Sequence, residues 1–468
     1  MLVASPDMYF GIDMLFRIPN LGLCSLAANA DRELCDIKIV DLISVRKKYK
    51  SYFIKLLRDY SPDIVGFSSM AFQYAGTLGL AKLAKEFNLN ITTLLGGYYA
   101  TVDSQTILEN DDMKYFDFLF RGEGEIAFNE FIKAFYNDWG FENVPGISYI
   151  SDNKIISNPS ACLANLDELK LPDRSARLLT KGFNCMGFKS DAIETSRGCV
   201  YDCNFCSIQN MYGKSYRKYK IERVLDDIRN AKKFGAQSLM MTDDNISLDG
   251  KRFKQLCEAI TDAKLNDVKY LTQASVDGIR RTPGLAKAMA ESGMNWVFLG
   301  IESSDDTALD YLNKSEQLKS SDTVEVVKEL KAYGIIVIGG FIFGYPDDTE
   351  ETLRANFEYA KKIGVDIPTF NILTPYPNTK VREELLQQNL ITNKSDYSKY
   401  DCWEVNIKTK HLSTADIYRI RNELEARFPI ESGALWRMAR KYPMYFAKLI
   451  PRWTFTKPQD FFKFLKGF

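Results

Sequence analysis

Three cysteines stand close together in the chain with a Cys-x3-Cys-x2-Cys spacing: Cys199, Cys203 and Cys206. Three thiolates can hold three irons of a 4Fe-4S cube, which leaves the fourth iron open to a small-molecule ligand. A zinc site would need a fourth ligand, usually from a second Cys or His pair at short spacing. Cys185 and Cys257 are isolated, and the single histidine, His411, is distant in the sequence. The motif therefore favours an iron-sulfur cluster over zinc.

The elements that must position this motif alternate between short apolar stretches and segments of helical periodicity. The central strand candidates are residues 192–195, 238–242, 270–274, 296–301, 335–343 and 367–373. Six βα repeats form an incomplete parallel barrel of the TIM type, whose chemistry lies at the carboxyl ends of the strands. The cysteine motif follows the first strand, so we expect it at that end of the barrel.

Polar residues follow the next three strands at the same end. Asp243 and Asp244 follow the second strand, Gln273 and Ser275 the third, and Glu302 the fourth, within a Gly-Ile-Glu-Ser run. A single carboxylate at such a position is often solvated or caps a helix. Because the strand ends of a barrel share one rim, their common position favours a single site.

The N-terminal third also alternates strands with helices, which predicts a doubly wound parallel sheet of the Rossmann type. Its strand candidates are residues 2–5, 36–42, 63–69, 91–97 and 116–120. Ligands of such sheets bind at the carboxyl ends of the strands. The loops expected there contain small hydroxyls, glycines and one carboxylate: Ser68, Ser69, Gly96, Gly97, Gly122 and Glu123.

In this order the two regions resemble radical S-adenosylmethionine (radical SAM) enzymes that carry a cobalamin-binding domain ahead of the catalytic domain. The resemblance covers residues 1 to about 380 and implies three cofactors: a 4Fe-4S cluster, S-adenosylmethionine and cobalamin. In that family the methionine amine and carboxylate chelate the open iron, and one electron cleaves the sulfonium to give a 5'-deoxyadenosyl radical. The loops of the N-terminal sheet would bind cobalamin.

The resemblance also assigns roles in the barrel. Asp243 and Asp244 would hold the methionine amine, whereas Gln273, Ser275 and Glu302 would contact the ribose or the amino acid. Phe205 and the backbone near Gly340 would bracket the adenine. Val200 replaces a proline found in many relatives, and we expect this change to be tolerated because the position is not a ligand.

One departure concerns the cobalt. The family signature for a histidine below the metal is Asp-x-His-x-x-Gly, but the matching loop reads Asp7-Met8-Tyr9-Phe10-Gly11. We therefore expect cobalamin to be bound without a histidine ligand, with the lower face open, water-bound or packed against a residue such as Tyr9. Tyr9 could equally line an apolar wall.

The resemblance implies a C-methyltransferase acting on an unactivated carbon. One S-adenosylmethionine would methylate cobalamin, and a second would supply the radical that removes hydrogen from the substrate. Relatives with the same two domains also perform cyclisation and rearrangement, which stay open as alternatives. A methylthiotransferase would need three further cluster cysteines, and the N-terminal domain offers only Cys24 and Cys35. The intact site residues argue against a non-catalytic cobalamin-binding sensor.

The chain of 468 residues suggests a cobalamin-binding-like domain (1–137), a hairpin and linker (138–190), a radical SAM partial barrel (191–380) and a mainly helical C-terminal region (381–468). Within the last region, residues 432–468 contain eight Lys or Arg, one acidic residue and many aromatics. This composition suits peripheral contact with an anionic membrane or with a large apolar substrate. Helices that cap the open barrel with snorkelling lysines are the structural alternative.

Composition limits the remaining possibilities. The counts of Lys+Arg and Asp+Glu are equal at 61, so net charge favours no nucleic-acid partner. Nine cysteines without a paired framework, no secretory signal and no apolar run of about 18 residues predict a cytoplasmic protein, with peripheral association at the inner membrane face as an option. The expected partners are a small-molecule or lipid-like substrate and a low-potential electron donor such as flavodoxin or ferredoxin.

Overall fold

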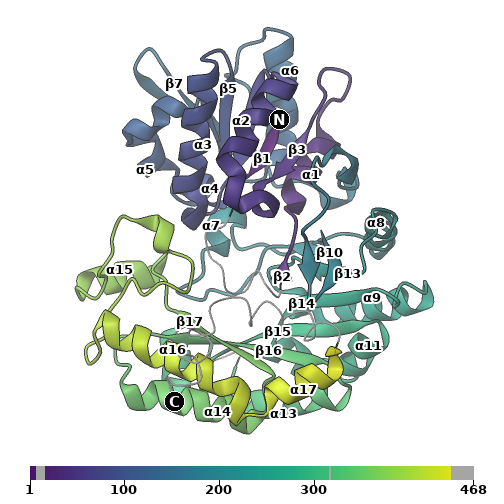
Figure 1. Ribbon diagram of the computed structural model, residues 1–468, viewed down its shortest axis with the longest axis vertical. Helices are drawn as coiled ribbons and strands as arrows, with labels where there is room; N and C mark the ends of the chain where they lie inside the picture. The colour runs from purple at the N-terminus through teal and green to yellow at the C-terminus, as the bar shows by residue number, and fades with distance from the viewer. Residues whose placement is uncertain (7–15, 316–317, 444–468) are drawn as a thin grey trace.

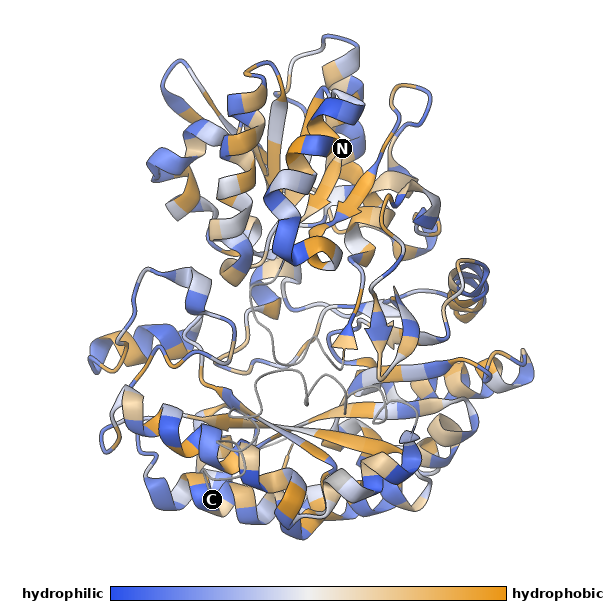
Figure 2. Ribbon diagram, viewed as in Figure 1, coloured by the Kyte–Doolittle hydropathy of each residue, from blue (hydrophilic) through white to orange (hydrophobic). Residues whose placement is uncertain are grey.

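The computed structural model describes residues 1–6, 16–315 and 318–443. Two sheets lie one above the other, with the N-terminal sheet and its helices at the top of Figure 1 and a wide curved sheet below. Buried apolar strands run through the middle of each layer, and the polar helix faces point outward (Figure 2). Loops from the facing ends of the two sheets lie between the layers (Figure 1).

The N-terminal sheet has seven strands in the order β3-β1-β4-β5-β6-β7-β8. Its parallel strands are β1 (Leu2–Ala4), β3 (Ile39–Asp41), β4 (Ile64–Ser68), β5 (Thr92–Gly96) and β6 (Phe118–Phe120). Because successive side chains of a strand point to opposite faces, Val3 packs under α2 (Tyr49–Tyr60) and α3 (Tyr74–Phe87). Leu2 and Ala4 pack under α1 (Leu21–Asn29) and α6 (Gly124–Tyr136). The predicted doubly wound sheet is confirmed.

The hairpin expected in the linker forms from β7 (Ile147–Ser151) and β8 (Lys154–Ser157). It belongs to the N-terminal sheet, because β7 pairs antiparallel with β6. An unpaired edge strand exposes its backbone donors and acceptors, and the hairpin satisfies those of β6. The linker proper therefore begins after the hairpin.

The second sheet has the order β17-β16-β15-β14-β13-β10-β9-β2. Its six parallel strands are β10 (Phe188–Ile193), β13 (Ser238–Met241), β14 (Lys269–Ser275), β15 (Met294–Glu302), β16 (Ile336–Phe343) and β17 (Ile367–Ile372). The main outer helices are α8 (Ile221–Lys233), α9 (Gly250–Asp262), α11 (Leu285–Glu291), α13 (Ser320–Ala332) and α14 (Glu350–Ile363). These elements are the predicted partial (β/α)6 barrel.

Two short strands close the β10 edge of this sheet. β9 (Asn184–Cys185) pairs antiparallel with β10, and β2 (Phe16–Arg17) pairs with β9. β2 comes from the N-terminal part of the chain and was not predicted, because two residues carry no readable periodicity. It anchors the N-terminal segment in the barrel sheet.

The C-terminal region contains α15 (Lys380–Gln387), α16 (Thr414–Glu431) and α17 (Ala434–Lys441). The mainly helical region predicted for residues 381–468 is interrupted at residues 388–413, where the only helix is the 3-10 turn η8 (Tyr397–Lys399). This stretch packs on the N-terminal domain, and the Tyr397 ring lies 5.7 Å from that of Tyr99. The conformation of this stretch is therefore set by its contact with the N-terminal domain, and not by a helical sequence pattern.

The basic, aromatic tail is described only up to residue 443, so most of the predicted membrane-contact segment lies outside the described residues. In the described part, Met438 and Tyr442 pack into the concave side of the barrel, and the Tyr442 ring stacks 5.8 Å from Trp296. Trp436 is exposed. Among the helices of the described residues, none is both long and apolar enough to span a bilayer.

Candidate active site

The cysteine loop leaves the first barrel strand through β11 (Ser196–Arg197), which pairs antiparallel with β12 (Arg217–Lys218). Gly198 has a φ of +88°, and a Cβ there would lie 2.4 Å from the Ser215 backbone oxygen. Only glycine fits this position, because both the conformation and the space exclude a side chain. The ribbon and the glycine together fix the start of the loop that carries the three thiols.

The two aspartates after β13 hold this loop. Asp243 is fully buried and accepts hydrogen bonds from the hydroxyls of Thr195 (2.7 Å) and Ser196 (2.5 Å) and from the Thr195 amide (3.2 Å). Asp244 accepts a 2.8 Å bond from the Gly198 amide through one carboxylate oxygen. Burial raises the pKa of each to about 6. Asp243 is thus committed to the loop, whereas Asp244 is the one that retains an oxygen for a ligand.

All three thiols are partly buried and free of disulfides. Burial raises the pKa of Cys203 to about 12 and that of Cys206 to about 11, while the Lys314 ammonium opposes the shift at each thiol. Iron binds the thiolate, so cluster binding must release these protons. Across the described residues, no group of three or more His, Cys, Asp or Glu converges on one metal position. In a 4Fe-4S cube each cysteine binds a different iron, so the donor set fits a cluster.

Glu302 lies at a β-bulge between β15 and β16 and has a φ of +62°, which is rare for a residue with a side chain. Its carboxylate accepts a 2.6 Å bond from Lys314, whose side chain is 16% exposed. The Lys314 Nζ also lies 5.9 Å from the Phe205 ring centre. A charged pair therefore stands beside the cysteine loop, where it could meet the charged end of a cofactor.

Sequence reasoning missed Lys314 because it lies 12 residues beyond Glu302, past α12 (Asp306–Tyr311). A lysine within a loop carries no pattern of its own. Only the folded chain reveals it: a Cβ on Gly300 would lie 2.7 Å from Glu302 Oε1 and 3.5 Å from Lys314 Nζ, so the glycine makes room for the pair.

The remaining predicted barrel residues lie on adjacent strands. Gln273 and Ser275 are on β14, and Gly340 is on β16 opposite Gly300. The Ser275 hydroxyl accepts from the Gly278 amide and shares a 3.1 Å bond with Ser247, so it caps α10 (Val276–Arg280). A Cβ on Gly340 would lie 2.6 Å from the Phe298 ring, so the glycine makes room for that ring.

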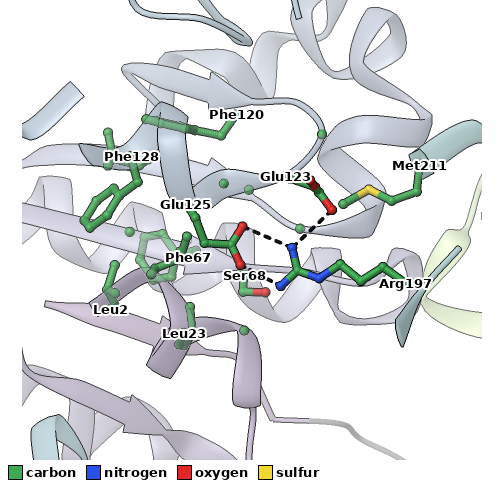
Figure 3. A pocket seen from close by; sticks show the side chains of 18 of the residues that line it. Leu2, Leu23, Phe67, Ser68, Phe120, Glu123, Glu125, Phe128, Arg197 and Met211 are labelled. Atoms are coloured by element: carbon green, nitrogen blue, oxygen red, sulfur yellow. Dashed lines mark hydrogen bonds and ion pairs between the residues drawn. The ribbon is translucent and has the colours of Figure 1, made fainter. Parts of the chain in front are cut away.

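A pocket with about 880 Å³ of empty space, part of it open to solvent, lies between the N-terminal sheet and the cysteine loop. It contains five of the six residues predicted for the N-terminal loops: Ser68, Gly96, Gly97, Gly122 and Glu123. Ser69 is absent from its lining, because the Ser69 hydroxyl is buried and donates to the Met70 carbonyl. Phe67, Phe120 and Phe128 line the apolar side of the pocket (Figure 3).

Three glycines, Gly96, Gly97 and Gly122, line one edge of the pocket, which we call the glycine rim. The pocket has room for a bulky group at this rim. Gly122 has a φ of +80°, and nothing lies within 4 Å of the position of a Cβ there. Gly97 has a φ of +95° and approaches Ser69 so closely that a Cβ would lie 2.8 Å from its amide. Open space beside glycine lets a backbone approach a large ligand, so this lining fits cobalamin. The predicted loop with Tyr9 lies outside the described residues.

The opposite side of the pocket is charged. Arg197 lies two residues before Cys199 and bonds Glu123 and Glu125 of the N-terminal domain (Figure 3). Tyr212, which follows the cysteine loop in α7 (Ile208–Tyr212), also lines the pocket. Neither Arg197 nor Tyr212 was among the predicted site residues, because only the fold brings them to the N-terminal loops.

Comparison with known families agrees with both halves of this arrangement. The Radical SAM superfamily profile matches residues 193–383, and the B12 binding domain profile matches residues 11–132. The cysteine loop therefore lies in the first matched region, and the glycine rim of the pocket in the second.

Three curated relatives are similar over most of this chain. The uncharacterized methyltransferase PH0819 of Pyrococcus horikoshii is 30% identical, and the match covers 89% of each chain. The anaerobic magnesium-protoporphyrin IX monomethyl ester cyclase of Cereibacter sphaeroides is 26% identical over 77% of this chain and 59% of its own length. The hopanoid C-3 methylase of Methylococcus capsulatus is 29% identical over 80% of this chain and 70% of its own length.

The fold is also that of a solved structure, the radical SAM methyltransferase TsrM of Kitasatospora setae with cobalamin and a [4Fe-4S] cluster bound. The TM-score is 0.66 at 18% identity, with 83% of this chain and 74% of that chain covered. The chain belongs to the radical SAM superfamily, and within it to the cobalamin-dependent enzymes that carry a B12-binding domain ahead of the radical SAM barrel.

Proposed function

We propose that this enzyme transfers a methyl group to an unactivated carbon of a small, largely apolar substrate. The observation that carries the proposal is that one pocket joins the two cofactor regions: Arg197, two residues from Cys199, and Gly122 of the N-terminal domain both line it. A radical generator and a methyl carrier held on either side of one space fit methyl transfer. The methyltransferase and methylase relatives support this reaction.

Bound cofactors would supply the radical and the methyl group, and the chain supplies binding and orientation. Cys199, Cys203 and Cys206 are proposed as the cluster ligands. We propose that Lys314, held by Glu302, meets the carboxylate of S-adenosylmethionine and that the unshared oxygen of Asp244 meets its amine. Opposite charges at fixed positions orient a zwitterion before the chemistry begins.

The side chains on the concave face of the barrel favour a largely apolar substrate. Apolar side chains line its lower part, where Met438 and Tyr442 of the C-terminal region also pack: Met240, Leu271, Phe298, Ile338 and Ile367. Above them, Gln273, Thr369 and Asn371 offer uncharged hydrogen-bonding groups. A neutral molecule with a few polar substituents, such as a lipid or a tetrapyrrole, fits this surface. We further propose that a low-potential donor such as flavodoxin or ferredoxin reduces the enzyme.

The test is anaerobic reconstitution with iron, sulfide and cobalamin, followed by reduction and chromatography of the S-adenosylmethionine products. We expect 5'-deoxyadenosine, and we expect it to disappear in Cys203→Ala. The matched control is Cys162→Ala, which changes an exposed cysteine outside the loop and should leave the product unchanged. Persistence of 5'-deoxyadenosine in Cys203→Ala would contradict the assignment.

A second product separates the two candidate reactions. With a true substrate present, S-adenosylhomocysteine formed alongside 5'-deoxyadenosine supports methyl transfer, because one cofactor molecule then gives up its methyl group. Its absence would favour cyclisation, the reaction of the Cereibacter sphaeroides relative.

A further inference from the structure

Five charged residues, three buried and two partly buried, form a network between the N-terminal domain and the cysteine loop, which we call the interdomain ion-pair network: Glu123, Glu125, Glu194, Arg197 and Arg217. Arg197 donates to Glu125 at 2.7 Å, to Glu123 at 3.1 Å and to Glu194 at 2.9 Å. Its side chain is 8% exposed, and those of Glu123 and Glu125 are 5% and 6% exposed. One guanidinium thus bonds carboxylates of both domains.

Each end of the network stands on a supported element. Glu125 lies in the first turn of α6 and accepts a 2.7 Å bond from the Ser25 hydroxyl of α1. Glu123 precedes α6 and accepts a 2.9 Å bond from the Ala164 amide of the linker. Arg197 and Arg217 face each other across the two-stranded β11–β12 ribbon. Both ends of the network are therefore held by bonds to further elements of the chain.

Buried charges make this contact specific to one arrangement of the domains. The planar fork of arginine bonds carboxylates at fixed angles, and a carboxylate buried without its partner is strongly unfavourable. Arg197 outweighs the effect of burial and holds the pKa of Glu125 below its ordinary value. Without Arg197, Arg217 would be the one cation left in the network, and its bonds there are to Glu123. A shift of either domain would leave buried charges unpaired.

We propose that Arg197 is a positioning residue that locks the N-terminal domain onto the cysteine loop and so sets the distance between the two cofactors. Its place in the chain supports this role, because only Gly198 separates it from Cys199. Its side chain also lines the pocket proposed for cobalamin. The statement about cofactor distance rests on the proposed function, whereas the lock between the domains does not.

The first experiment tests the lock in the full-length protein without cofactors. Arg197→Met should raise amide hydrogen exchange in residues 118–130 about tenfold or more, because the start of α6 loses its anchor. Arg197→Lys keeps the charge but loses the fork, so the rise should be smaller. Glu125→Gln weakens the same contact from the other domain, away from the cysteine loop, and should reproduce the rise if Arg197→Met does not fold.

Arg174→Met is the matched control. Arg174 is fully buried and bonds Asp191 and Asp227, but both of these lie in the barrel domain. Its loss should destabilise the protein without a selective rise in residues 118–130. Unchanged exchange in Arg197→Met and Glu125→Gln, or an equal rise in Arg174→Met, would overturn the proposal.

The second experiment measures geometry in the holoenzyme with the reduced cluster and cob(II)alamin, both of which are paramagnetic. Pulsed EPR should show one narrow cluster-to-cobalt distance in the wild type and in Arg174→Met, and a broadened one in Arg197→Met and Glu125→Gln. An unchanged narrow distance in the last two variants would overturn the role in cofactor spacing. If exchange rises but no variant, nor the wild type, binds cobalamin, the lock stands and the proposed function fails.

Discussion

At the scale of single residues, two features of the barrel rim act together: the strained backbone of Glu302 and the glycine at position 300. Glu302 adopts a left-handed φ of +62°, and backbone strain of this kind persists where surrounding contacts enforce it. Its carboxylate bonds Lys314 directly above Gly300, where only a hydrogen atom fits. The pair beside the cysteines is therefore built by the bulge, the lysine and the glycine together.

Gly300→Ala should displace this pair, because the new Cβ would lie 2.7 Å from Glu302 Oε1. We expect reductive formation of 5'-deoxyadenosine to fall roughly 10- to 100-fold, since small misplacements at a reacting centre have large effects. Bound iron should stay at the wild-type level. The control is Gly79→Ala in α3, where nothing lies within 4 Å of the new Cβ. Wild-type product formation in Gly300→Ala would contradict the role of the pair.

Lys314→Met tests the charge itself. The ammonium favours ionised thiols in the loop. In the proposed function it also pairs with the carboxylate of S-adenosylmethionine. We expect the KM for S-adenosylmethionine to rise about tenfold or more, the order expected for loss of a charge-assisted hydrogen bond. Lys314→Arg should recover part of the affinity. The measurement is 5'-deoxyadenosine formation against cofactor concentration, and an unchanged KM would refute the assignment.

At the scale of elements, α16 covers α14 through an apolar contact and a group of ion pairs. The rings of Phe357 and Phe428 meet edge-to-face at 5.8 Å. Glu423 of α16 is bonded by Arg354 of α14 and by Arg427 of its own helix. The hydrogen bond from Arg354, together with the one from Arg427, lowers the pKa of Glu423 from 4.5 to about 2. This contact attaches the C-terminal helix to the barrel.

Glu423→Gln should lower the unfolding temperature at neutral pH by a small amount, corresponding to about 1 kcal/mol or less, because the pair is partly exposed. A carboxylate with a lowered folded-state pKa stabilises the fold fully above its unfolded pKa of about 4.5. The contribution is lost as the pH falls towards 2. The difference between wild type and variant in thermal melts should therefore shrink below pH 4.5, and a difference that grows with acidity would disprove this explanation.

At the scale of the whole molecule, the described residues form several connections that hold the two sheets in one arrangement. β2 places the N-terminal segment in the barrel sheet, and the interdomain ion-pair network joins α6 to the cysteine loop. On the other side, Tyr397 packs on Tyr99, and Asn378 donates to the Val102 carbonyl. The interdomain ion-pair network borders the pocket between the domains, because Glu123, Glu125 and Arg197 line it.

Tyr397→Ala should loosen the N-terminal domain from the C-terminal side, with a loss of about 1–3 kcal/mol for truncating a half-buried ring. The ring touches Tyr99 of one domain and Tyr400 of the other, so its removal leaves a gap at their contact. Limited proteolysis of residues 158–183 should be faster, and cobalamin should be retained less well. Tyr333→Ala, at an exposed ring, is the control. Equal rates in both variants would contradict this role.

The fold class of both halves follows from local patterns, because short apolar runs that alternate with amphipathic segments leave little choice except parallel sheets with helices. The sequence by itself also determined the chemistry that Cys199, Cys203 and Cys206 can perform, since ligand type and spacing are local properties. The cofactor family followed from the order of these local patterns along the chain, and the comparisons agree.

The roles of individual side chains, in contrast, follow from contacts that form only in the folded chain. Asp243 and Asp244 are neighbours in sequence, yet one is enclosed by Thr195 and Ser196 while the other keeps a carboxylate oxygen for a ligand. Glu123, predicted as a cofactor contact, lines the pocket but is bonded by Arg197 and Arg217. These outcomes depend on contacts between residues far apart in the chain, which local periodicity and spacing do not encode.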